Sequence, residues 1–197
     1  MIAIGIDPGD KGAVVVLRQL AGQPWSVARA EEWRRWHEAP ELIFDALGEL
    51  DGLPASCPIV AAVEGIEVIR RDRSLSGALT LAQRAGECLG ALRVALPEAT
   101  IYQAPARDWR AALLGVSMSA SGDGSLAMLR RALASHPSAI EADRSELAVM
   151  APAGPWGWAE ASEHVVEAAG LALFAAMRLE RWRWDRAGSW AARRRAG

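Results

Sequence analysis

Residues 2–16 read IAIGIDPGDKGAVVV, and this stretch sets the expected fold. An apolar run stops on Asp7, passes through a turn containing Pro8 and two glycines, and continues as a second apolar run. Glycine and proline are typical of tight turns between strands, so the stretch predicts a hairpin. A carboxylate at the end of a buried strand either caps the turn or is held there for chemistry. The rest of the chain has to decide between these two readings.

Hydrophobic periodicity places further elements along the chain. Strands are expected at 25–33, 57–64 and 99–103 after those at 2–7 and 13–19, and helices at 39–50, 74–96, 105–114, 125–134 and from near Glu160 to 183. Three strands come first, and strands separated by helices follow. This order predicts an α/β fold with a mixed five-stranded sheet and helices on both faces.

Composition limits the classes to which the protein can belong. The chain has 197 residues, 51% of them hydrophobic, and a formal net charge of -2, which favours one domain and gives no global signal for nucleic acid. No apolar run is long enough to cross a membrane and no signal peptide is evident, so a cytoplasmic location is expected. Cys57 and Cys88 lie far apart, which makes a disulfide or zinc site improbable.

Acidic side chains recur where elements begin or end. Asp7 and Glu64 each close an apolar strand, and the last helix carries His164 and Glu167 three residues apart on one face. Clustered carboxylates repel one another unless a cation joins them, and hard oxygen ligands suit Mg²⁺ or Mn²⁺. The pattern therefore predicts a metal site, with Glu163 as the rival of His164 for the fourth ligand.

Basic residues are unevenly distributed. Arg70, Arg71 and Arg73 follow Glu64 closely and are expected to contact phosphate, and an Arg- and Trp-rich tail occupies residues 184–197. The tail is expected either as a solvated helix end or as a nucleic-acid arm. Residues 135–158 are rich in Pro, Ala and Gly and are expected as an insert in a domain spanning 1–183.

The order of these motifs resembles the RuvC Holliday-junction resolvases of the ribonuclease H-like superfamily. The resemblance covers most of the chain. It rests on GIDPG at residues 5–9, where the first strand ends, on the strand-end Glu64, on the helix sequence SGALTLAQRAGECLGAL and on a last helix with an acid before AAGLAL. It implies that Asp7, Glu64, His164 and Glu167 hold two divalent ions. The family more often has Asp where this chain has His164 and Glu167.

The resemblance also implies the activity: metal-dependent hydrolysis of phosphodiesters in branched DNA, above all four-way junctions, by a homodimer formed through the helix at 74–96. Lys11 or an arginine is then expected to neutralise the scissile phosphate. Glu67 stands where the resolvases place an aromatic wedge, which leaves the preferred DNA structure open. Two alternatives remain: a non-catalytic DNA-binding protein of this fold, and an ATP-binding protein of the actin-like group, although a second Gly-rich phosphate motif is missing.

Overall fold

The computed structural model describes residues 1–20, 25–48, 50, 52, 57–65, 75–114, 123–135, 158 and 161–187. Its strands are β1 (Ile2–Asp7), β2 (Gly12–Arg18), β3 (Ser26–Trp33), β4 (Ile59–Gly65) and β5 (Thr100–Pro105). Its helices are η1 (Trp36–Glu38), α1 (Ala39–Gly48), α2 (Leu75–Ala95), α3 (Ala106–Leu114), α4 (Asp123–Ser135) and α6 (Glu163–Ala187). Every strand and helix expected in these ranges is present, with ends shifted by a few residues.

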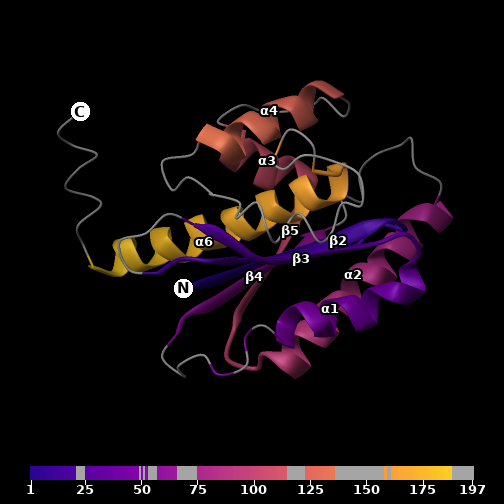
Figure 1. The fold of residues 1–197 in the computed structure, drawn as a ribbon, viewed down its shortest axis with the longest axis horizontal. Coiled ribbons are helices and arrows are strands. Elements are labelled where there is room, and N and C mark those ends of the chain that lie inside the picture. Colours follow the sequence, from indigo (N-terminus) through magenta and orange to yellow (C-terminus); the bar gives the residue numbers. More distant parts are fainter. Residues whose placement is uncertain are drawn as a thin grey trace.

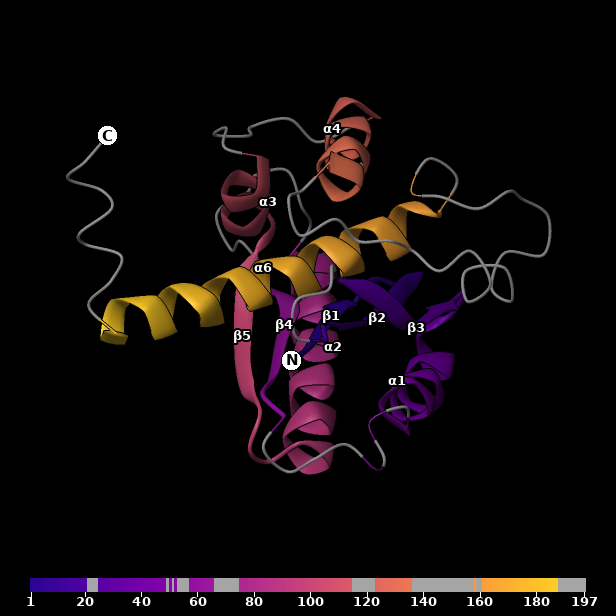
Figure 2. The ribbon, with the colours of Figure 1, turned by 60° about the vertical axis from the view of Figure 1, so that its left-hand side comes forward.

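The five strands form one mixed sheet in the order β3-β2-β1-β4-β5. The pairs of β2 with β1 and with β3 are antiparallel, whereas β4 is parallel to both β1 and β5. Helix α6 covers one face, with α3 and α4 packed on its outer side, and α1 and α2 cover the other (Figures 1 and 2). The expected α/β architecture, a mixed five-stranded sheet with helices on both faces, is confirmed.

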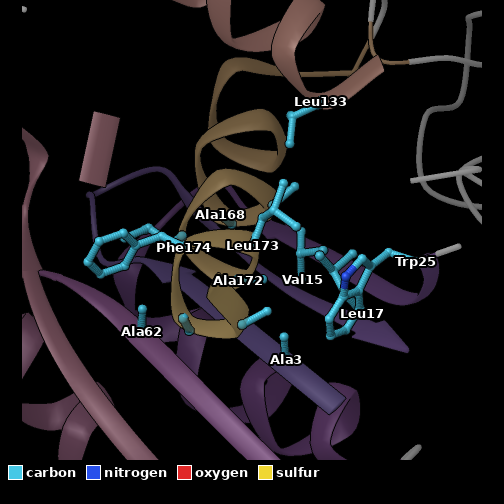
Figure 3. Packing of buried hydrophobic residues seen from close by; sticks show 14 of the residues in the cluster. Ala3, Val15, Leu17, Trp25, Ala62, Leu133, Ala168, Ala172, Leu173 and Phe174 are labelled. Atoms are coloured by element: carbon cyan, nitrogen blue, oxygen red, sulfur yellow. The ribbon is translucent and has the colours of Figure 1, made fainter. Parts of the chain in front are cut away.

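The side chains of β1 alternate strictly between the two faces. Isoleucines 2, 4 and 6 enter the core beneath α1 and α2, whereas Ala3, Gly5 and Asp7 face α6. A Cβ on Gly5 would lie 1.8 Å from the carbonyl oxygen of Ala168, so only glycine fits there. Small residues on the sheet and on the helix, including Ala62 of β4 and Ala168 and Ala172 of α6, let α6 lie directly against the sheet (Figure 3).

The turn after β1 uses its glycines for close packing. Neither Gly9 nor Gly12 has a positive φ, so the turn does not need glycine at these positions for its backbone conformation. A Cβ on Gly9 would lie 2.2 Å from the Lys11 carbonyl oxygen, and one on Gly12 would lie 2.5 Å from the Trp33 ring. Both positions exclude a side chain because other atoms already fill the space.

The last helix begins at Glu163, later than the expected start near Glu160. The hydroxyl of Ser162 accepts a hydrogen bond from the Val165 backbone N–H at 3.2 Å and so caps the helix. Arg130 on α4 donates to the Ala161 carbonyl oxygen at 2.7 Å, which ties this start to the outer helices. The helix continues through residue 183 to Ala187, whereas 188–197 and most of 135–158 lie outside the described residues.

Candidate metal centre

Three carboxylates meet at one end of the sheet. Asp7 ends β1, Glu64 lies next to last in the parallel strand β4, and Glu167 comes from the first turns of α6. One oxygen from each of them lies within 4.8 Å of the other two. Asp7 is only 7% exposed, and Glu64 and Glu167 are half-buried. The structure thus brings together the three acids that the sequence pattern singled out.

The sheet register explains why the two strand acids meet. Ile6 of β1 is opposite Val63 of β4, so Asp7 and Glu64 occupy the next position of the same parallel ladder. Residues directly opposite each other in neighbouring strands point to the same face, and here that face carries α6. Glu32 of β3 is in the same row, since it is opposite Ala13, which in turn is opposite Asp7.

Both oxygens of Asp7 have partners. Oδ1 accepts a hydrogen bond from the Gly9 backbone N–H at 3.2 Å, and Oδ2 lies 2.8 Å from Nδ1 of His164. The hydrogen bond to Asp7 raises the pKa of His164 above its usual 6.5, with smaller contributions from Glu32 and Glu167. His164 therefore belongs to this end of the sheet through its contact with Asp7.

Arg110 is a member of the site that the sequence did not reveal. Its guanidinium on α3 forms an ion pair with the carboxylate of Glu167, and the two side chains are 17% and 14% exposed. Arg110 also lies over the ring of Trp109, 5.1 Å from its centroid. Burial, with a smaller contribution from Asp7, raises the pKa of Glu167 from 4.5 to about 7, although Arg110 acts in the opposite direction. Chain position gives no signal for this pairing, since 57 residues separate the two.

The remaining candidates have different positions. Lys11 lies in the turn after Asp7 with its side chain exposed. Glu163, the rival of His164, is exposed and does not belong to the group of three acids found among the described residues. Arg70, Arg71 and Arg73 lie outside the described residues, as does Glu67.

The donor set suits a hard cation. Carboxylate oxygens in a partly buried group prefer Mg²⁺ or Mn²⁺, and the positive charge offsets their mutual repulsion. The 2.8 Å between His164 and Asp7 is also close to the ~3 Å between adjacent ligands around an ion with bonds of about 2.1 Å. The three acids therefore fit a divalent metal, and His164 lies beside them through its contact with Asp7.

Comparisons with known proteins gave structural matches only. No family model and no curated protein matches the sequence. A structure of RuvC from Thermus thermophilus has 19% identity and a TM-score of 0.49, and the match covers 96% of this chain and 98% of that chain. A structure of T. thermophilus RuvC in complex with Holliday junction substrate has 18% identity and a TM-score of 0.48 with the same coverage. Among the described helices, none is long and apolar enough to span a membrane.

Proposed function

We propose that this protein is a metal-dependent endonuclease that hydrolyses phosphodiesters in branched DNA, with four-way junctions as the preferred substrate. The observation that carries the proposal is the meeting of Asp7, Glu64 and Glu167, whose oxygens lie within 4.8 Å of one another beside His164. Three acids held this close on rigid elements are costly without a cation. The carboxyl ends of the strands are also where open α/β sheets bind their ligands.

Each residue has a role in this proposal. Asp7, Glu64, Glu167 and His164 would hold the two Mg²⁺ or Mn²⁺ ions. The ions, when bound, activate a water for in-line attack and stabilise the leaving 3′ oxygen. The Gly9 N–H and the Arg110 guanidinium orient two of the carboxylates. Lys11, exposed on the adjoining turn, neutralises the scissile phosphate.

A four-way junction has two-fold symmetry, so paired cleavage requires two copies of the site. The outward face of α2 supports a homodimer, because Leu79 and Val94 are 61% and 80% exposed there. Gly86 and Gly90 on the same helix leave open space above the backbone, which allows a second helix to approach closely. Sedimentation of the wild type and of Gly90→Glu tests this, and a dimer unaffected by the glutamate would place the interface elsewhere.

The deciding experiment uses labelled four-way, three-way, flap and linear duplexes with Mg²⁺ or Mn²⁺. Wild type should nick the branched substrates, and EDTA should stop the reaction. Asp7→Asn should lose cleavage but keep its fold and its junction binding, because the change removes a ligand at nearly constant volume. Asp45→Asn, an exposed acid on α1 beneath the other face of the sheet, is the matched control and should behave as wild type.

Two outcomes would favour the alternatives. Tight junction binding without metal-dependent cleavage by the wild type would indicate a non-catalytic DNA-binding protein. Binding of ATP in place of DNA would indicate the actin-like alternative, in which Asp7 and the glycine turn contact phosphate. Full cleavage activity of Asp7→Asn would remove the acid group from the mechanism.

A further inference from the structure

The turn formed by residues 8–11, between β1 and β2, is anchored to helix α2. Nη2 of Arg84 lies 2.9 Å from Oδ1 of Asp10, across 74 positions of sequence. Asp10 is an exposed turn residue, with 72% of its side chain accessible, whereas that of Arg84 is only 19% accessible. The arginine is thus the fixed partner, and the turn residue is the one whose freedom the contact removes.

Arg84 is held in place by its own surroundings. Its guanidinium lies over the ring of Trp36, 5.4 Å from the centroid. The indole N–H of Trp36 donates to Glu87 at 2.9 Å, and Gln83 donates to the same carboxylate at 2.8 Å. A planar guanidinium stacked on an aromatic ring loses little further freedom when it pairs with a carboxylate. This geometry favours a lasting contact with Asp10.

The same turn is held from a second side. The indole N–H of Trp33, a fully buried residue at the end of β3, donates to the Gly9 carbonyl oxygen at 3.1 Å. The backbone N–H of Gly9 in turn donates to Oδ1 of Asp7. Gly9 therefore presents its carbonyl to Trp33 and its N–H to the acid, and movement of the turn would change the hydrogen bond that orients Asp7.

We infer that Arg84 is a positioning residue for the metal centre: it fixes Asp10, and through the turn it aims the Gly9 N–H at Asp7. The inference rests on the proposed function, because it assigns Arg84 to the same metal site. It also links α2, whose outward face is proposed as the dimer surface, to the first acid of the site. A partner that shifted α2 would act on Asp7 through this contact.

The test measures Mn²⁺ binding alone, by calorimetry at pH 8. Arg84→Gln and Asp10→Ala should each raise the Kd by about threefold to tenfold, less than the loss of a direct partner of a metal ligand, because Arg84 acts through Asp10 and Gly9. The double variant should bind no more weakly than either single variant, because both remove one contact. Arg84→Lys, which keeps the charge, should fall between Arg84→Gln and wild type. Arg93→Gln, an exposed arginine on the same helix, is the control.

Hydrogen exchange adds a measurement that needs no metal. The amides of residues 9–11 should exchange faster in Arg84→Gln than in the wild type, and those of β4 should be unaffected. An unchanged Kd together with a lowered melting temperature would make the contact a surface ion pair and overturn the inference. That result differs from failure of the proposed function, in which the wild type and Asp7→Asn would bind Mn²⁺ equally weakly.

Discussion

Nδ1 of His164 lies 2.8 Å from Oδ2 of Asp7, which joins the start of the last helix to the end of the first strand. The contact joins Asp7, the predicted ligand on the first strand, to His164, the candidate fourth ligand whose rival is Glu163. His164 contacts Asp7 and Glu163 is exposed, but neither belongs to the group of three acids, so His164 as the fourth ligand stays a prediction.

Replacement of His164 should reduce cleavage in a way that depends on the new side chain. His164→Ala should lower the rate by roughly tenfold or more, since a ligand is lost, whereas His164→Asp supplies an oxygen ligand and should retain activity. Initial cleavage rates measure both. Glu163→Gln is the control and should resemble wild type. An inactive Glu163→Gln beside an unaffected His164→Ala would give the fourth position to Glu163.

The metal-free protein should become more stable as the pH falls from 8 toward 5. Burial raises the pKa of Glu167 from 4.5 to about 7, and Asp7 raises that of His164 above 6.5. The folded state therefore holds these protons more tightly than the unfolded chain, and the stability is lost as the pH rises through the folded values. For Glu167 the effect is on the order of 3 kcal/mol.

Melting temperatures in EDTA between pH 5 and 8 measure this dependence. Glu167→Gln cannot titrate and should flatten the curve, whereas Asp45→Asn should not. A wild-type slope in Glu167→Gln would mean that other groups cause the dependence. Mn²⁺ should reverse the trend, because metal binds the deprotonated ligands and stabilises the fold most at high pH.

The pH profile of Mn²⁺ affinity for Arg110→Gln should cross that of the wild type. Removal of the guanidinium lets the pKa of Glu167 rise further, so binding should weaken near pH 6, where the proton competes. At pH 9 the loss of a nearby positive charge should instead tighten binding. Calorimetry at pH 6 and pH 9 measures the two affinities. Arg107→Gln, on the same helix with 59% of its side chain exposed, is the control. A uniform change at both pH values would contradict the prediction.

Gly5→Ala should destabilise the protein by about 3 kcal/mol or more, because its Cβ would meet backbone atoms of α6 that no rotamer change can move. The displaced helix would also carry His164 and Glu167 away from Asp7. Gly48→Ala, in open space at the end of α1, should instead be neutral or stabilise by up to about 1 kcal/mol. Urea denaturation measures both. Equal stability of Gly5→Ala and wild type would show that α6 tolerates the shift.

Replacement of Arg70, Arg71 and Arg73 by Ala should weaken DNA binding and flatten its salt dependence. Each lost phosphate contact reduces the slope of log affinity against log salt by about one, since fewer counterions are released. Titrations at several salt concentrations measure the slope. An unchanged slope would place the DNA elsewhere on the protein.

The acids could be predicted from the sequence because their positions follow from local patterns. Asp7 and Glu64 each end an apolar run, and a helical repeat places His164 and Glu167 on one face. The parallel pairing of β1 with β4 then brings the strand ends together. These features depend on strand and helix periods, which a single sequence carries.

Arg110, Arg84 and the role of Gly5 could not be predicted, because each depends on how separate elements pack. Arg110 meets Glu167 only because α3 lies on the outer side of α6. In the sequence Arg84 is one charge among several on a helix, and its contact with Asp10 follows only from the packing of the turn against α2. In the sequence Gly5 is an ordinary strand glycine. Only the packing of the Ala168 backbone of α6 against it shows why a side chain does not fit there.

The way α6 closes one face of the sheet has a consequence for how the chain reaches its native state. The strand residues beneath it, such as Ala3 and Val60, are made more than 100 residues before their partners on α6. Contacts so distant in sequence form slowly, and until they form an apolar sheet face is open to chaperones or to association with other chains. During synthesis the acids of the first strand and of the last helix are likewise apart, so the proposed metal site cannot assemble until the last helix has been made.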